Sequence, residues 1–136
     1  MSRYIPESLR ILVAERAKHR CEYCLLPAQD SLFTFHIDHI ISIKHGGETD
    51  LNNLAYACQI WNLNKGTNIA TFLDKTLTPV RLFNPRIEPW EEHLEIDLMG
   101  ELIPRTSIGH ATIKVLDLNH PDGIIERREL IRLGFL

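Results

Sequence analysis

Four polar residues in the middle of the chain carry the side chains that a single divalent-metal site needs. Asp38 and His39 are adjacent, Asn53 follows fourteen positions after His39, and Asn62 follows nine positions after Asn53. Carboxylate and carboxamide oxygens suit Mg²⁺, which keeps several waters and accepts phosphate oxygens. An imidazole, with an ordinary pKa of about 6.5, is mostly neutral at cellular pH and can take a proton. The set predicts one metal site with a built-in general base, which suits phosphodiester hydrolysis.

The local structure must bring these residues together. Successive strand residues point to opposite faces, so Asp38 and His39 can serve one site only where their strand ends or bends. The loop over residues 40–52 contains Gly46-Gly47 and supplies such an ending. A helix with Asn62 near its start can then lie across the hairpin, which places the Asn62 oxygen opposite the Asp38 carboxylate.

The order and spacing of these residues resemble the signature of the HNH endonuclease family, in which Asp-His, a mid-motif Asn and a later Asn or His form a ββα-metal site. The likeness to small stand-alone bacterial HNH proteins continues through Arg81–Arg86 and Trp90–His93 and covers about residues 4–130. It implies an α+β fold, with a ββα-metal (HNH, His-Me finger) core and flanking N- and C-terminal helices. It also implies a metal-dependent endonuclease that acts on DNA.

The resemblance implies a role for each residue of the set. Asp38 and Asn62 would bind the catalytic Mg²⁺ or Mn²⁺ ion, His39 would be the general base, and Asn53 would orient the imidazole through its carboxamide or backbone carbonyl. Each residue also has a purely structural explanation. An Asp-His pair is common in a loop corner, and asparagines such as Asn53 and Asn62 are common in turns and helix caps. The combination of all four favours catalysis.

Lys65 is the next residue for which the resemblance implies a role. The run from Asn62 to Gly66 is similar to the family's Asn-x-x-Lys-Gly segment, and this implies that Lys65 contacts the nucleic-acid backbone. The alternative is a solvated lysine on a helix surface.

Three cysteines form a second candidate site. Cys21-x-x-Cys24 resembles half of a zinc knuckle, and the second half is reduced to Cys58-x-x-Trp61, with Trp61 at the position of the fourth cysteine. Structural zinc takes four N or S ligands in tetrahedral geometry, so this Zn²⁺ site is incomplete unless His19, His36 or a water fills it. The alternative is a metal-free cluster in which Trp61 and the cysteines pack as apolar residues.

Length and composition indicate one soluble globular domain. The chain has 136 residues, of which 44% are hydrophobic and 24% charged, and no apolar run approaches the length of a membrane span. The start lacks the apolar region of a signal peptide, which predicts a cytoplasmic protein with reduced thiols. We expect a single HNH endonuclease domain over 1–136, with a core motif at about 20–72 and a C-terminal extension at about 73–136.

The overall charge does not by itself indicate nucleic-acid binding. The net charge is −3, whereas proteins that coat nucleic acids are usually basic. Basic residues concentrate in positions 1–20, and the segment after Pro85 is acidic. The first region is therefore a candidate for contact with DNA, and the second should face away from it or hold cations.

Periodicity predicts the elements around the motif. Helices are expected from Pro6 to about Lys18, from Trp61 to about Ala70, after a Ser107 cap, and after Pro121. Strands are expected near Phe33–His39 and Leu54–Ala57. The helix at Trp61 rests mainly on the resemblance, because Gly66 and Thr67 lower the helix propensity.

Two other classes of function compete with the nuclease. A catalytically silent nucleic-acid-binding HNH-like module would explain the missing fourth cysteine and the acidic charge. A redox or zinc-storage protein that uses Cys21-x-x-Cys24 would need the first cysteine on a thioredoxin-like helix that follows a strand, but a helix is expected before the motif.

Overall fold

The structure is a computed structural model that describes residues 4–29, 31 and 34–136. Within these ranges it has helices and three antiparallel sheets of two strands each, so the predicted α+β fold class is confirmed. The helices are α1 (Glu7–Arg16), α2 (Gln59–Lys65), α3 (Trp90–His93), α4 (Ser107–Leu116) and α5 (Pro121–Arg132). The strands are β1 (Phe35–His39), β2 (Leu54–Cys58), β3 (Ala70–Thr71), β4 (Val80–Arg81), β5 (Leu94–Ile96) and β6 (Leu102–Pro104). None of the helices described is long and apolar enough to cross a membrane.

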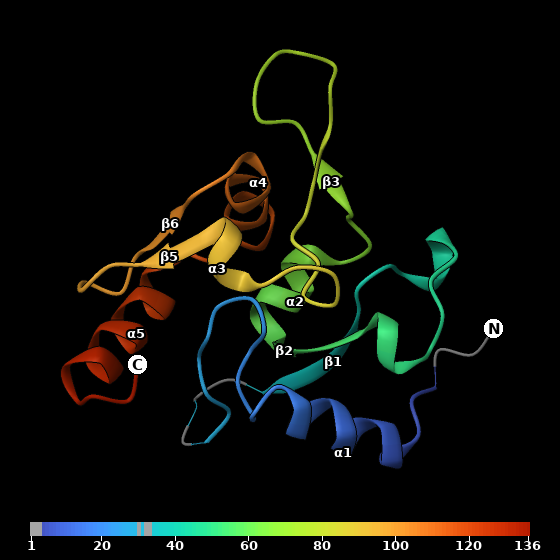
Figure 1. Cartoon of the computed structure of the whole chain (residues 1–136), viewed down its shortest axis with the longest axis horizontal. Helices are drawn as coiled ribbons and strands as arrows, with labels where there is room; N and C mark the ends of the chain where they lie inside the picture. Colours follow the sequence, from blue (N-terminus) through green and yellow to red (C-terminus); the bar gives the residue numbers. More distant parts are fainter. Residues whose placement is uncertain (1–3, 30, 32–33) are drawn as a thin grey trace.

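The hairpin of β1 and β2, with α2 directly after it, forms a ββα unit. Phe35 pairs with Cys58 at one end and His39 with Leu54 at the other, which places Asp38 opposite Ala55. α2 packs on both strands, whereas α1 packs on β2 from the opposite side of the hairpin (Figure 1). The hairpin is therefore supported on both faces, and its end at His39 is fixed.

A long loop joins the two strands and contains two short 3₁₀ turns, η1 (Ile43–His45) and η2 (Leu51–Asn53). Arg16, at the end of α1, donates to the Leu51 carbonyl at 2.8 Å and to the Leu54 carbonyl at 2.6 Å. These bonds tie the last part of the loop and the start of β2 to the N-terminal helix.

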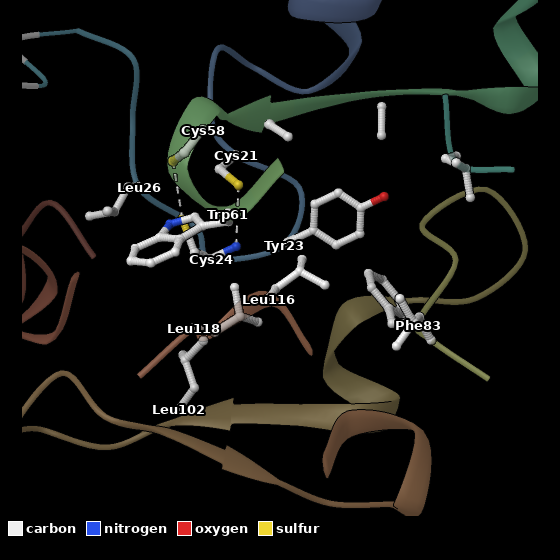
Figure 2. Close-up of a cluster of buried hydrophobic side chains, with 14 of the residues drawn as sticks. Cys21, Tyr23, Cys24, Leu26, Cys58, Trp61, Phe83, Leu102, Leu116 and Leu118 are labelled. Atoms are coloured by element: carbon white, nitrogen blue, oxygen red, sulfur yellow. Dashed lines mark hydrogen bonds between the residues drawn. The ribbon is translucent and has the colours of Figure 1, made fainter. Parts of the chain in front are cut away.

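The C-terminal half packs against the ββα unit. α4 packs on α2 and on β6, and one cluster of buried apolar residues includes members from both halves. It contains Trp61 from α2 together with Leu102, Leu116 and Leu118 (Figure 2). α2 is thus held between the hairpin and the C-terminal elements.

The predicted bounds of α2 and the predicted cap of α4 differ from the structure. α2 begins at Gln59 rather than Trp61 and ends at Lys65, where Gly66 takes a positive φ of 52° that glycine allows. Ser107 is the first residue of α4, and the N-cap is Thr106, whose hydroxyl accepts from the Gly109 amide. Phe33, the predicted start of the first strand, lies outside the described residues.

Trp61 should contribute strongly to stability, because its side chain is fully buried between α2 and the C-terminal half. We expect Trp61→Ala to lower the free energy of unfolding by about 3–5 kcal/mol, through lost burial and a cavity. Leu63→Ala on the same helix is the control, because Leu63 is 67% exposed and its removal should cost less than about 0.5 kcal/mol. Urea denaturation measures both values, and similar losses would contradict the placement of Trp61.

Candidate active site

Three of the four predicted site residues line one open cleft along the outer edge of β1. Asp38 and His39 lie at the end of the strand, and Asn62 faces them from α2; the cleft has a volume of about 570 Å³. Arg10 from α1 and Lys44 from the loop also line it and supply positive charge. The cleft therefore combines oxygen ligands, an imidazole and basic side chains.

Asp38 is the most enclosed of these residues, with 5% of its surface exposed. The Tyr23 hydroxyl donates to Oδ2 at 3.0 Å, and the Lys65 ammonium nitrogen lies 3.1 Å from Oδ2 and 3.3 Å from Oδ1. Burial raises the pKa of Asp38, while Lys65 and Tyr23 act in the opposite direction. Burial and the Asp38 charge raise the pKa of Tyr23 well above its ordinary value, so its hydroxyl stays protonated and donates.

Lys65 points into the protein rather than into the cleft. It is 2% exposed, and besides Asp38 its Nζ donates to the carbonyls of His39 at 3.2 Å and Ile40 at 3.0 Å. Its contact with a nucleic-acid backbone stays a prediction. In the structure, the ammonium group binds the end of β1.

His39 is half-buried, and its Nε2 lies 2.9 Å from the Thr49 hydroxyl. A hydroxyl can donate or accept, so Thr49 can orient either tautomer of the imidazole. The backbone next to His39 is also fixed, because the Ile40 amide donates to the Asn53 carbonyl at 2.9 Å. The imidazole is therefore held at a strand end beside the cleft.

Asn53 closes the loop that carries these groups. Its Oδ1 accepts from the Ile41 amide at 2.9 Å, and its Nδ2 donates to the Ile41 carbonyl at 2.8 Å and to the Glu48 carbonyl at 2.9 Å. All three of these bonds go to loop backbone. That Asn53 orients His39 stays a prediction. The contacts above show how it could act indirectly: Asn53 holds the loop that carries Thr49, and Thr49 contacts the His39 imidazole.

Two adjacent glycines permit this closure for different reasons. Gly46 has a φ of 90°, which side-chain-bearing residues rarely adopt, but it has open space around it. Gly47 lies against the loop backbone, and a Cβ atom there would be 1.7 Å from the Ile41 oxygen and 2.7 Å from the Asn53 Nδ2. Only glycine fits at position 47 without displacing Asn53.

The three cysteines lie together in the core behind this site. Their sulfur atoms are all within 4.8 Å of one another, and those of Cys24 and Cys58 are 3.4 Å apart. Trp61 is fully buried beside them (Figure 2). Neither His19 nor His36 belongs to this cluster among the described residues; His36 lines the cleft instead. The three sulfur atoms are close enough together to hold one metal ion, and the Trp61 indole packs beside them (Figure 2).

A buried arginine lies close enough to act electrostatically on this cluster. Arg127 of α5 is fully buried and donates from Nε to the Gly100 carbonyl at 2.7 Å and from Nη2 to the Leu118 carbonyl at 2.8 Å. Burial lowers the pKa of Arg127, and the charges of the three cysteines act in the opposite direction. Its positive charge would offset the negative charge that three thiolates leave on a bound Zn²⁺ ion.

Sequence reasoning missed several residues of the site. Tyr23 lies inside the Cys21-x-x-Cys24 turn, and no pattern there indicates a contact with Asp38. His36 could have been found, because it is two positions before Asp38 and strand alternation puts both on one face. Thr49 has no signal in a loop sequence.

The loop geometry predicts opposite tolerance at the two glycines. Gly47→Ala should lower the free energy of unfolding by about 3 kcal/mol or more, because the new methyl group overlaps backbone atoms. Gly46→Asn should cost only about 1 kcal/mol, since asparagine tolerates the left-handed region. Urea denaturation of both variants provides the comparison, and an equal cost at the two positions would refute the close approach at Gly47.

The cysteine cluster predicts that the fourth position limits zinc affinity. Trp61→Cys should bind one zinc ion per chain and retain it against a chelator at concentrations that strip the wild type. Zinc content after graded chelation measures this difference. Cys58→Ser is the control and should bind more weakly than the wild type. Equal retention by the wild type and Trp61→Cys would mean that position 61 does not complete the ligand set.

Comparison with known proteins bears on the same segment. Residues 21–68 match the HNH endonuclease family model, and this range spans Cys21, the whole hairpin and α2. Searches of curated proteins and of solved structures gave no match. Asp38, His39, Asn62 and the three cysteines all lie within the matched range, so the segment that carries the candidate site is similar to the HNH endonuclease family.

Proposed function

We propose that this chain is a metal-dependent endonuclease that hydrolyses DNA phosphodiester bonds. The observation that carries the proposal is the cleft itself. Asp38, His39 and Asn62, which come from two elements, line one open surface inside the segment that matches the HNH family. The cleft is open to solvent on the free edge of β1, so a nucleic-acid backbone could enter it without rearrangement of the hairpin.

Asp38 and Asn62 would hold a single Mg²⁺ or Mn²⁺ ion, because they offer one charged and one neutral oxygen to the same cleft. When bound, such an ion would supply electrostatic stabilisation of the charge that develops on the phosphate. A site with only two protein ligands leaves room for waters and a phosphate oxygen. The donor set therefore fits the ion that the family uses.

His39 would remove a proton from the water that attacks the phosphorus atom. The Thr49 hydroxyl restrains the ring through Nε2, and the strand end fixes its backbone. Asn53 would contribute by closing the loop that carries Thr49. Arg10 and Lys44 line the same cleft and would attract the phosphate backbone, although the overall charge of the chain is negative.

A silent nucleic-acid-binding module is the second candidate, and one observation favours it. The Lys65 ammonium group already neutralises the Asp38 carboxylate, which leaves it less negative for a divalent ion. In that case DNA would bind along the cleft without being cut.

Cleavage of supercoiled plasmid separates the two candidates. We expect nicking or linearisation with Mg²⁺ or Mn²⁺ but not with EDTA. His39→Ala should reduce the rate by about 10²–10⁴-fold, because the general base is lost. His110→Ala is the matched control, because His110 is exposed on α4 and does not line the cleft.

Addition of Mg²⁺ alone to chelated protein should restore cutting, which would separate the catalytic ion from any zinc at the cysteines. Cutting that continues in EDTA, or that His39→Ala leaves unchanged, would contradict the proposal. If both proteins bind DNA and neither cuts it, the silent module is the correct account.

A further inference from the structure

The Asp38 carboxylate is held by two donors that come from different parts of the chain. Tyr23, from the turn before the hairpin, donates to Oδ2 at 3.0 Å. Lys65, from the end of α2, places its ammonium nitrogen 3.1 Å from Oδ2 and 3.3 Å from Oδ1. Oδ2 therefore has two close partners, whereas the one contact of Oδ1 with the described residues is the longer one with Lys65. Asp38 still lines the cleft.

Both donors are themselves fixed. The Lys65 ammonium group is locked by the carbonyls of His39 and Ile40. The Tyr23 ring is 1% exposed and meets Phe83 edge-on, with ring centroids 6.3 Å apart. The Tyr23 carbonyl also accepts from Trp90 Nε1 at 2.9 Å. Neither donor can follow the carboxylate if it rotates, so the pair defines one orientation of Asp38.

We propose that Tyr23 and Lys65 are positioning residues, which fix the Asp38 carboxylate so that Oδ1 faces the cleft as the ligand for the divalent ion. This inference rests on the proposed function, because it assigns the supporting contacts of the same metal site. Groups that hydrogen-bond a metal-ligating carboxylate set its direction, and their loss typically reduces metal affinity by about 10–100-fold.

The proposal also gives the cysteine turn a role at the active site. Tyr23 lies between Cys21 and Cys24, and its hydroxyl points away from their sulfur atoms (Figure 2). Lys65 lies on the helix that begins directly after Cys58. The cysteine cluster thus joins the two segments that carry the donors, and it fixes the distance between them.

Direct binding of Mn²⁺ to the whole chain, measured by titration calorimetry, tests the proposal without relying on turnover. Tyr23→Phe keeps the ring and removes only the hydroxyl, and we expect it to weaken Mn²⁺ binding by about tenfold or more. Tyr56→Phe is the matched control; Tyr56 is half-buried on β2, outside the cleft, and should bind as the wild type does. Asp38→Asn should bind far more weakly than either variant.

Lys65→Met should weaken binding at least as much as Tyr23→Phe. Its control is Lys114→Met, which removes an exposed lysine that donates to the Phe72 carbonyl on the far side of α2 from the hairpin. If Lys65→Met does not fold, as judged by urea denaturation, Tyr23→Phe alone decides. In cleavage assays, Tyr23→Phe should need more Mn²⁺ for half-maximal rate, with kcat restored at saturating Mn²⁺ and KM for DNA unchanged.

The outcomes are distinguishable from failure of the proposed function. A wild type that binds no Mn²⁺ and cuts no DNA overturns the function and this inference together. If the wild type binds Mn²⁺ and cuts, while Tyr23→Phe binds Mn²⁺ as tightly as the wild type, the positioning role is wrong and the function stands. Tighter binding by Lys65→Met would show that the ammonium group opposes the metal, and it would overturn the role of Lys65.

Discussion

The buried ion pair between Asp38 and Lys65 is the interaction on which the site depends. Both side chains are nearly inaccessible, and a buried carboxylate or ammonium group without a partner costs several kcal/mol. The pair also joins β1 to α2, since Lys65 binds the carbonyls of His39 and Ile40 as well as the carboxylate. The crossing of the helix over the hairpin is therefore fixed at the position where His39 and Asn62 line the same cleft.

Stability alone does not explain why an ion pair is buried here, because apolar residues of similar size often stabilise a core as well or better. The carboxylate of the pair lines the cleft in which we propose the metal site, while Lys65 is buried behind it. Burial restricts how the carboxylate can turn, and the ammonium group compensates part of its cost. Such a fixed direction is what the proposed role of Asp38 as a metal ligand requires.

The local pattern was sufficient to predict the hairpin, whereas the following helix, and with it the place of Asn62 in the same cleft as Asp38 and His39, rested mainly on the family resemblance. It was not sufficient for Lys65. Helical spacing did indicate that Lys65 could be buried, because it is four positions after Trp61 and both side chains are buried on the same face of α2. A lysine is nevertheless expected to face solvent unless it has a buried partner, and the partner of Lys65, Asp38, is known only from the tertiary structure. Tyr23 and Thr49 contact the site through tertiary structure alone, so no local pattern could have identified them.

The Trp61 side chain connects the cysteine cluster to the C-terminal half of the chain. Gly123 of α5 lies against the indole, and a Cβ atom there would be 3.0 Å from Trp61 Cζ2 and 3.2 Å from Arg127 Nη1. The small residue lets α5 approach the ring closely, so the indole joins the cysteine turn to the C-terminal helix by packing. A zinc knuckle joins its two segments by metal bonds, which are short and local. Here the same two segments are also joined by a large buried side chain, and it extends the connection to a third segment. The C-terminal half is therefore joined to the cysteine turn by packing on the Trp61 indole.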